Sequence, residues 1–304
     1  MIIFGGIDGT GEWGNDGYAK SFKFSHVNEL YKGWDAVPTR APERGPWWVG
    51  DWTRVYANNL FEFVMSEWKA EGTAVFLAGY SRGGAAVIEV AKWLKAENVP
   101  VECLILFDPV DRSRTVGENL GWSNTPIVDT VKNVIYAKRN PATKSRESFG
   151  NCGTVLQNPN KTTKFSKTFF ATHGGMGGTP WLEPEIGFID EGSPDFKTHV
   201  TRDMDVLGCV EVGEWAFKIV RCLLWECKRN LAQPVTPIQT PVKVPIIPGR
   251  PTRIHIVKPG DWLSKIAITY YGDMNKWTTI YDANKSVIGN NPDLIKPGMQ
   301  LVIP

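Results

Sequence analysis

One serine stands in a spacing that is typical of an activated nucleophile. Ser81 lies in the string Gly79-Tyr80-Ser81-Arg82-Gly83, between an apolar run at 74–78 and a stretch of small and apolar residues that begins at Ala85. This spelling, placed between a strand and a helix, forms a tight turn that presents the serine hydroxyl, and the glycines leave room for its backbone. The pattern predicts a nucleophile at Ser81; a glycine-rich turn that holds an ordinary serine is the alternative.

The base for such a serine is sought among four histidines: His26, His173, His199 and His255. Nucleophile, acid and base follow in that order along chains of this kind, which removes His26 because it precedes Ser81. His255 belongs to a separate C-terminal segment. His173 opens a glycine-rich loop that allows close approach to a site, whereas His199 lies in a charged segment and is expected at the surface. We therefore predict that His173 is the base.

The acid that orients this base is predicted at Asp108. This residue directly follows the apolar run at 101–107, and the first residue after a strand is held firmly in space. An aspartate before a proline is also a common turn residue. Asp111 and Asp129 compete for the same role.

Acyl transfer also needs hydrogen-bond donors for the oxyanion of the tetrahedral intermediate. The backbone N–H of Arg82, the residue after the serine, is one expected donor. The second is expected from the glycine-rich stretch after the first apolar run, at Gly9 or Thr10. That stretch lacks the lysine of a phosphate-binding loop, so we expect no nucleotide there.

The elements that must position these residues follow an alternating pattern. Short apolar runs typical of strands occur at 2–4, 74–78, 101–107, 133–137 and 165–171. Helix-length amphipathic segments occur at 52–70, 85–97 and 212–227. This alternation predicts an α/β fold, a mostly parallel sheet flanked by helices, with ligands bound at the carboxyl ends of its strands.

Proline divides the chain into two bodies. Six of the 21 prolines fall between residues 233 and 252, where they favour an extended spacer. We therefore predict a catalytic domain at 1–230, a proline-rich linker at 231–252 and a binding domain at 253–304. The last of these has the pattern strand, helix, helix, strand.

The composition excludes several classes of protein. A net charge of +2 over 304 residues removes the electrostatic basis for nucleic-acid binding. Five irregularly spaced cysteines form neither a disulfide framework nor a zinc site, and we expect free thiols with no cofactor and no metal. No apolar run is long enough to span a bilayer, and the first residues lack the charged region of a signal peptide. We expect synthesis in the cytoplasm and, for any delivery to a target-cell envelope, a leaderless route.

Four short motifs of the first body occur together in a known family. They stand at 2–11, 79–84, 107–110 and 172–178. Together they resemble the α/β-hydrolases of type VI secretion lipase effectors and their relatives (domain of unknown function 2235), over about residues 1–228. The resemblance implies an α/β-hydrolase fold, the triad of Ser81, Asp108 and His173, and hydrolysis of lipid or phospholipid esters. Family members usually carry an acidic residue shortly after the histidine, where this chain has glycines.

The tail at 254–304 carries several spaced motifs that resemble a LysM domain. The resemblance implies a small βααβ fold and binding of peptidoglycan or another N-acetylglucosamine glycan. The residues that it assigns to the glycan groove are Gly260, Asp261, Trp262, Leu263, Asn291, Pro292, Leu294 and Ile295. Trp262 replaces the usual threonine and would either stack on a sugar or block the groove. Tails of this kind also serve as protein docking modules.

Together these features predict a serine esterase or lipase that a LysM tail tethers to peptidoglycan-type glycan, used as an antibacterial effector. The expected partners are a lipid or phospholipid substrate, the glycan, and an immunity or secretion-apparatus protein. Two alternatives remain: a catalytically degenerate hydrolase-fold protein that binds or assembles, and an acyl esterase that acts on cell-wall polymers. Reaction of Ser81 with a serine-directed probe separates the degenerate binding protein, whose serine would not react, from the two esterases.

Overall fold

The computed structural model describes most of the chain, in two units. The described residues are 1–10, 22–32, 43–45, 51–70, 72–113, 125–147, 149–182, 187–191, 197–231, 253–258, 261–289, 291–292 and 294–304. Contacts divide the chain into Met1–Gln233 and Pro234–Pro304. The linker predicted at 231–252 lies outside the described residues except for its first residue, so its extended form stays a prediction.

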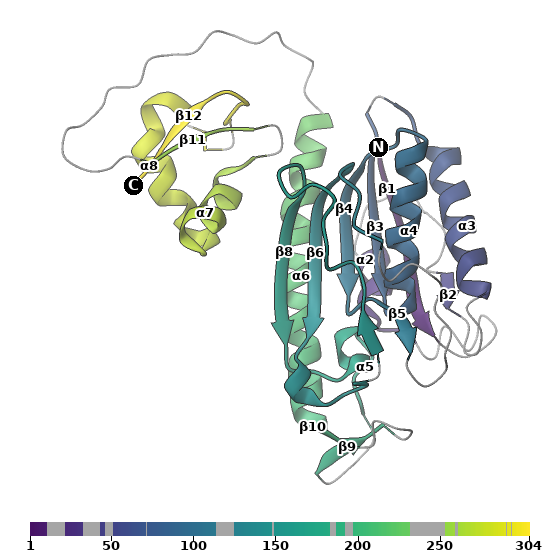
Figure 1. Ribbon diagram of the computed structural model, residues 1–304. Helices are drawn as coiled ribbons and strands as arrows, with labels where there is room; N and C mark the ends of the chain where they lie inside the picture. The colour runs from purple at the N-terminus through teal and green to yellow at the C-terminus, as the bar shows by residue number, and fades with distance from the viewer. Residues whose placement is uncertain are drawn as a thin grey trace. The chain divides into compact units, whose positions relative to one another are not determined.

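The first unit is built on a six-stranded sheet whose paired strands all run parallel, in the order β2-β1-β3-β4-β6-β8 (Figure 1). The strands are β1 (Ile2–Thr10), β2 (Glu43–Gly45), β3 (Ala74–Tyr80), β4 (Val101–Phe107), β6 (Val131–Arg139) and β8 (Thr163–Phe169). Four of the five apolar runs of the sequence lie within these strands, and the run at 165–171 overlaps β8 but extends two residues past its end. The prediction of a mostly parallel α/β sheet is therefore confirmed.

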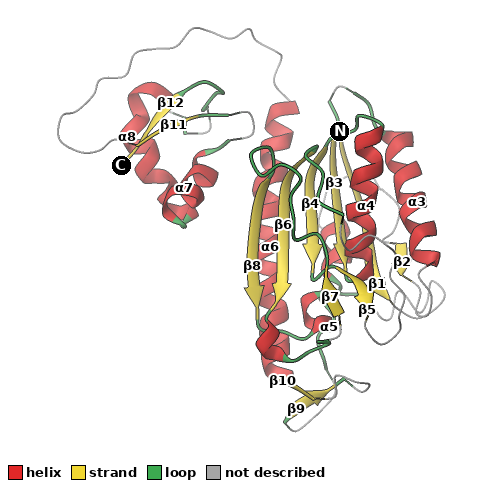
Figure 2. Ribbon diagram, in the orientation of Figure 1, coloured by secondary structure: helices red, strands yellow, loops and turns green. Residues whose placement is uncertain are grey.

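Helices cover both faces of this sheet. Helices α3 (Asp51–Glu67) and α4 (Arg82–Ala96) pack on one face, and α6 (Arg202–Leu231) lies along the other, behind β6 and β8 (Figures 1 and 2). Short α2 (His26–Lys32) contacts β1 and β3. On β4, alternate side chains face opposite sides: Leu104 packs in the α3/α4 core, and the Phe107 ring lies 5.1 Å from that of His26 on α2. Burial on both faces explains why the central strands β3 and β4 are nearly continuous apolar runs, whereas β8 at the edge of the sheet exposes several polar side chains.

Several short elements follow the carboxyl ends of the strands. They are β5 (Val110–Ser113), η1 (Pro141–Thr143), β7 (Phe149–Asn151), α5 (His173–Met176), β9 (Phe188–Asp190) and β10 (Lys197–Thr201). Strand β5 pairs antiparallel with β7, and β9 pairs antiparallel with β10. The sequence pattern predicted none of these elements, and together they surround the end of the sheet where a ligand is expected.

The prediction for the last helix of the first unit was too short. The amphipathic segment indicated 212–227, whereas α6 runs from Arg202 to Leu231. Its first turns expose Leu207 (66%) and Val210 (51%), and apolar residues on the outer face obscure the helical periodicity there. Although α6 has 30 residues, no helix in the described part of the chain is long and apolar enough to cross a membrane.

The second unit has the predicted order of strand, helix, helix, strand. Its elements are β11 (Arg253–Ile256), α7 (Leu263–Tyr271), the single turn η2 (Met274–Lys276), α8 (Trp277–Ile288) and β12 (Gln300–Ile303), and β11 pairs antiparallel with β12. An apolar core includes Ile266, Ile280 and Leu301. Buried Asn284 joins α8 to β12, because its side chain accepts from the Val302 N–H and donates to the Val302 carbonyl, both at 2.7 Å.

All five cysteines are free, as the sequence predicted. Four of them, Cys103, Cys152, Cys209 and Cys227, are buried, and Cys222 is partly exposed. Among the described residues, no group of three or more His, Cys, Asp or Glu side chains is arranged to hold a metal ion.

The turn between β3 and α4 leaves no room for side chains at its glycines. A Cβ atom at Gly83 would collide with the carbonyl oxygens of Ile7 and Asp8, and one at Gly84 would lie 2.5 Å from Cβ of Pro109. The obstructing atoms at Gly83 are backbone, which cannot move aside as a flexible side chain can. The turn therefore seats α4 directly against the end of β1.

We expect Gly83→Ala to lower the stability of the first unit by about 3 kcal/mol, because the added methyl group forces backbone apart. For a unit of this size the melting temperature should fall by about 6–12 °C, measured by circular dichroism. Gly150→Ala is the matched control, because a Cβ at Gly150 meets no atom within 4 Å. Equal melting temperatures for the two variants would contradict the close packing of the turn.

Candidate active site

Ser81 occupies the sharp turn at the carboxyl end of β3. Its backbone has φ 54° and ψ −125°, a conformation that residues other than glycine rarely adopt. The Ser81 N–H donates to the Phe107 carbonyl at 3.2 Å, and the Ser81 carbonyl accepts from the Val110 N–H at 2.9 Å. The turn is thus fixed to the segment that follows β4. Strained backbone that its surroundings hold in this way is concentrated at functional sites.

His173 is fixed through its backbone and by two aromatic rings that contact its imidazole. Its carbonyl accepts from the Tyr80 hydroxyl at 2.9 Å, and its ring centroid lies 5.1 Å from that of Tyr80 and 5.2 Å from that of Phe149. The preceding Thr172 caps α5 by accepting from the Gly175 N–H at 3.1 Å. The Asp205 carboxylate accepts from the N–H and hydroxyl of Thr172, at 2.6 and 2.9 Å, so α6 also holds this segment.

The structure joins the three predicted triad residues in one chain of hydrogen bonds. His173 Nε2 lies 2.8 Å from Ser81 Oγ, and His173 Nδ1 lies 2.7 Å from Asp108 Oδ2. All three side chains are buried. Because a carboxylate only accepts, His173 carries its proton on Nδ1 and donates it to Asp108, which leaves Nε2 to accept the Ser81 hydroxyl proton. This is the geometry of a serine whose proton a neighbouring base can remove.

The charges of the site favour an ionised acid and a neutral base. Burial acts to raise the pKa of Asp108, but Arg139 and the hydrogen bonds from His173 and Asn151 outweigh it and hold the pKa at about 2. Burial lowers the pKa of His173 below its usual value, and Asp108 opposes that shift only in part. At neutral pH, His173 is therefore ready to accept a proton.

The acid in contact with His173 is Asp108, and the rival Asp129 lies in a different environment. The Asp129 carboxylate accepts from Lys95 at 2.7 Å and from Lys161 at 3.1 Å, and these two bonds lower its pKa. Asp111 is buried in β5.

The remaining histidines of the first unit lie apart from this chain of hydrogen bonds. His199 is exposed, with its ring 6.1 Å from that of Phe188. His26 is buried against Phe107 and Phe217, and burial lowers its pKa to about 4.

The two stretches predicted to supply oxyanion donors both lie beside Ser81. Arg82 is the first residue of α4, where backbone N–H groups have no acceptor within the helix and the helix dipole favours negative charge. Gly9 passes close to the nucleophile, since a Cβ atom there would lie 3.0 Å from Cβ of Ser81. Thr10 ends β1 next to it. The backbone of β1 therefore forms one wall of the site.

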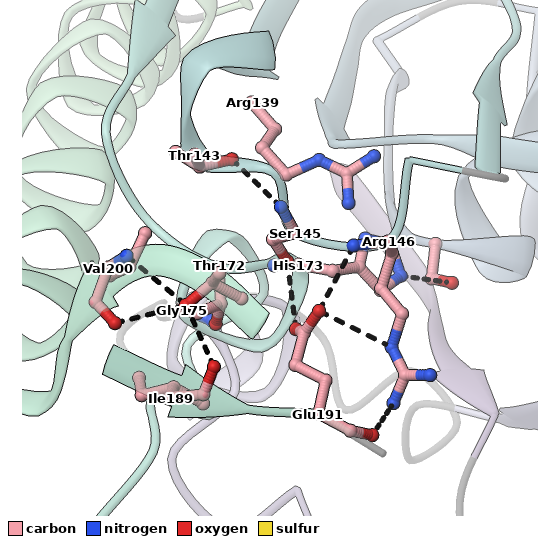
Figure 3. Close-up of polar contacts among 12 residues, drawn as sticks. Arg139, Thr143, Ser145, Arg146, Thr172, His173, Gly175, Ile189, Glu191 and Val200 are labelled. Carbon is pink, nitrogen blue, oxygen red and sulfur yellow. Dashed lines mark hydrogen bonds and ion pairs between the residues drawn. The ribbon is translucent and has the colours of Figure 1, made fainter. Parts of the chain in front are cut away.

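The sequence analysis missed a cluster that holds the backbone of His173. The His173 N–H donates to Ser145 Oγ at 2.8 Å, and the Ser145 hydroxyl donates to Glu191 Oε1 at 2.8 Å (Figure 3). The second oxygen, Glu191 Oε2, accepts from the Arg146 N–H at 3.0 Å. Ser145 and Arg146 follow η1 and Glu191 follows β9, so no local motif in the sequence indicates that they meet.

Asn151 and Arg139 were missed as well. Asn151, at the end of β7, donates to Asp108 Oδ1 at 2.7 Å, and Arg139, at the end of β6, approaches Oδ2 with its Nε at 3.4 Å. An asparagine and an arginine are common residues with no distinctive spacing here. Only the position of β6 beside β4 and the pairing of β5 with β7 bring them to Asp108.

The two glycines that follow His173 have no room for a side chain. A Cβ atom at Gly174 would lie 2.6 Å from the Thr179 carbonyl oxygen, and one at Gly175 would collide with the Asp205 carboxylate. No acidic side chain fits at either position in this chain. The carboxylate that this loop contacts is that of Asp205 on α6, which accepts from the Thr172 and Trp181 N–H groups.

In the second unit, the predicted groove residues are anchored in different ways. Asp261 Oδ2 accepts from His255 Nε2 at 2.7 Å and from the Lys258 N–H at 2.9 Å. The Lys265 ammonium lies 5.1 Å from the ring centroid of partly exposed Trp262. These contacts tie the start of α7 to β11.

The other predicted groove residues differ in exposure. Leu263 and Ile295 are buried in the core of the unit, whereas Asn291 and Leu294 are exposed and Pro292 is partly exposed. Gly260 lies outside the described residues. Leu263 and Ile295 are thus core residues by their burial, and of these five residues only Asn291, Pro292 and Leu294 present surface.

Comparison with known proteins identifies the second unit. Residues 255–304 match the family model of the LysM domain. An uncharacterized protein of Deinococcus radiodurans is 51% identical over 51 residues, 17% of this chain and 19% of that protein. Potassium binding protein Kbp of Escherichia coli O6:H1 is 40% identical over 57 residues, 19% of this chain and 38% of that protein. The chain thus spans only about a fifth to two fifths of these relatives.

Comparison of structures adds no argument about the first unit. A crystal structure of an uncharacterized protein from Pseudomonas aeruginosa has 17% sequence identity and a TM-score of 0.25, and the match covers 41% of this chain and 22% of that one. A likeness of this size shows neither the fold nor the chemistry.

We expect Glu191→Gln to slow the reaction of Ser81 with a fluorophosphonate about tenfold. The Glu191 carboxylate accepts one hydrogen bond on each oxygen, from the Ser145 hydroxyl and from the Arg146 N–H. A glutamine has a single acceptor oxygen, so one of these bonds is lost and Ser145 holds the His173 backbone less firmly. Glu147→Gln is the control, because Glu147 is exposed and pairs only at the surface with Lys144 at 2.8 Å. Labelling rates followed by mass spectrometry should separate the two variants; equal rates would show that the Glu191 cluster does not support the base.

Proposed function

We propose that the first unit is a serine esterase of the α/β-hydrolase type that hydrolyses lipid or phospholipid esters. The observation that carries this proposal is the hydrogen-bonded chain from Ser81 Oγ through His173 to Asp108, with separations of 2.8 and 2.7 Å. Its members come from the ends of β3 and β4 and from the start of α5, which is where ligands bind in parallel sheets. The lipid class of substrate comes from the resemblance of the sequence to lipase effectors.

In this mechanism His173 Nε2 takes the hydroxyl proton as Ser81 Oγ attacks the ester carbonyl carbon. The oxyanion that forms accepts hydrogen bonds from the N–H of Arg82 and from the backbone at Gly9 or Thr10. The intermediate collapses, the alcohol leaves with the proton from His173, and the acyl group remains on Ser81. Water then gives a proton to His173 as its oxygen attacks the acyl carbon. When this second intermediate collapses, the acid leaves and His173 returns the proton to Ser81 Oγ, which restores the free serine.

Asp108 serves this cycle by keeping His173 in one tautomer and by stabilising the imidazolium that forms. Its pKa of about 2 means that it stays ionised throughout the range in which His173 titrates. The positive φ values of Ser81 (54°) and Asp108 (42°) aim both side chains at the imidazole between them.

The LysM domain at 255–304 indicates binding to peptidoglycan or another N-acetylglucosamine glycan. We propose that this binding raises the concentration of the esterase near a cell envelope. An antibacterial role, with an immunity or secretion-apparatus partner, stays a prediction from the resemblance.

A second candidate substrate is an acyl ester on a cell-wall polymer. The LysM domain favours it, because a domain that binds glycan would bring the catalytic unit to acyl groups on the same polymer. The chemistry at Ser81 is the same for both substrates, and only the acyl carrier differs.

Ser81→Ala should reduce hydrolysis of p-nitrophenyl esters and of phospholipid vesicles at least about a thousandfold, because the attacking oxygen is lost. Ser66→Ala is the control, since Ser66 is an exposed residue of α3 that bonds only its own helix. Both variants should still sediment with peptidoglycan. Retained hydrolysis in Ser81→Ala would contradict the triad; wild-type activity on acylated wall polymer but not on vesicles would favour the second candidate.

For the LysM domain we expect Trp262→Ala to weaken binding to peptidoglycan about tenfold, or about 1.4 kcal/mol. Lys265 lies over the Trp262 ring at 5.1 Å and so holds the ring in one orientation for stacking on a sugar. Trp225→Ala, at a residue of α6 that is 51% exposed, is the matched tryptophan control. Tighter binding by Trp262→Ala would show that the ring blocks the groove.

A further inference from the structure

Arg139 places a buried positive charge directly beside the triad. It is the last residue of β6 and is only 7% exposed. Its Nε lies 3.4 Å from Asp108 Oδ2, and its Nη1 is buried without a hydrogen-bond partner among the described residues. A buried guanidinium with an unsatisfied donor destabilises a fold relative to a well-packed apolar side chain. Arg139 compensates the buried charge of Asp108, but this pairing leaves Nη1 without a hydrogen-bond partner among the described residues.

The geometry makes Arg139 and His173 share one carboxylate oxygen. Asp108 Oδ2 accepts from His173 Nδ1 at 2.7 Å and also faces Arg139, whereas Oδ1 is occupied by Asn151 at 2.7 Å. A protonated His173 would put a second positive charge on the oxygen that Arg139 already faces. The two cations would then compete for the same negative charge.

We propose that Arg139 is a positioning residue of the triad, whose guanidinium offsets part of the Asp108 charge and so keeps His173 a neutral base at lower pH. The inference rests on the proposed function, because it concerns the base of that reaction. The Arg139 charge thereby extends the working range of the esterase toward acidic pH. His173 stops acting as a proton acceptor only when its imidazole becomes protonated.

The other charged groups near His173 support this assignment. Burial is the main cause that lowers the pKa of His173; Asp108 opposes it, Arg139 adds to it, and Glu191 raises the pKa. The Tyr80 phenol, from β3, stays neutral because burial raises its pKa far above the usual range. The Asp205 carboxylate, from α6, accepts hydrogen bonds from Thr172 and from the Trp181 N–H. Arg139 is thus the cation that faces the triad acid in the described part of the first unit.

The test removes the positive charge of Arg139 by substitution and measures the pKa of His173 directly. Nitrogen NMR of the imidazole in a Ser81→Ala background gives the pKa of His173 without any substrate, so this readout survives failure of the proposed esterase activity. Arg139→Gln should raise this pKa by about one unit, a tenfold change in the fraction of neutral imidazole at acidic pH. Arg139→Lys keeps the charge and should leave the pKa within a few tenths of a unit.

The same variants with Ser81 intact give a kinetic readout. In Arg139→Gln the acidic limb of the pH profile for fluorophosphonate labelling should move to higher pH by the same amount, with little change on the alkaline plateau. A parallel loss at every pH, or an unchanged or lower pKa of His173, would overturn the proposal. Arg139→Met, which fills similar volume without donors, replaces Arg139→Gln should that variant not fold. Failure of both neutral variants to fold would also overturn the proposal, because Arg139 would then serve the fold.

Absence of labelling in the wild-type protein, together with a His173 pKa that responds to Arg139 as expected, would reject the esterase and leave the electrostatic assignment standing.

Discussion

The left-handed backbone of Ser81 is the constraint on which the first unit depends. It exists because β3 must turn directly into α4, with β1 pressed so close that a Cβ at Gly83 would collide with the Ile7 carbonyl. The turn is strained, and its strain is held by hydrogen bonds to the segment at Phe107 and Val110. Because that segment also carries Asp108, the position of the proposed nucleophile and that of its acid are fixed by the same contacts.

The buried charges of the site are arranged so that each has a partner of opposite sign or a set of donors. Asp108 has Arg139, Asn151 and His173, and Glu191 has the Ser145 hydroxyl and the Arg146 N–H. Asp108 stays ionised although it is buried, because the Arg139 charge and the hydrogen bonds from His173 and Asn151 favour the charged form and lower its pKa. The result is a neutral imidazole between two fixed carboxylates, one on its ring and one behind its backbone.

Much of the sheet could be predicted from the sequence, because its central strands β3 and β4 are buried on both faces and are therefore apolar over most of their length. The meeting of Ser81, Asp108 and His173 could be predicted, because a local motif marks Ser81 and chain order then limits the choice of acid and base. The supporting residues could not. Arg139, Asn151 and Glu191 come from separate elements, and only tertiary packing brings them to the site. In the LysM domain, the motif order predicted the elements, whereas burial distinguishes the core residues Leu263 and Ile295 from the exposed groove residues.

The central claim is that Ser81, His173 and Asp108 act as one unit, and a double-mutant cycle tests it most directly. The rate of Ser81 phosphonylation is measured for wild type, His173→Ala, Asp108→Asn and the double variant. The account predicts that each single change slows the reaction strongly and that the double variant reacts no more slowly than His173→Ala, because Asp108 acts only through the imidazole. Independent effects that multiply in the double variant, or a wild-type serine that does not react, would contradict it.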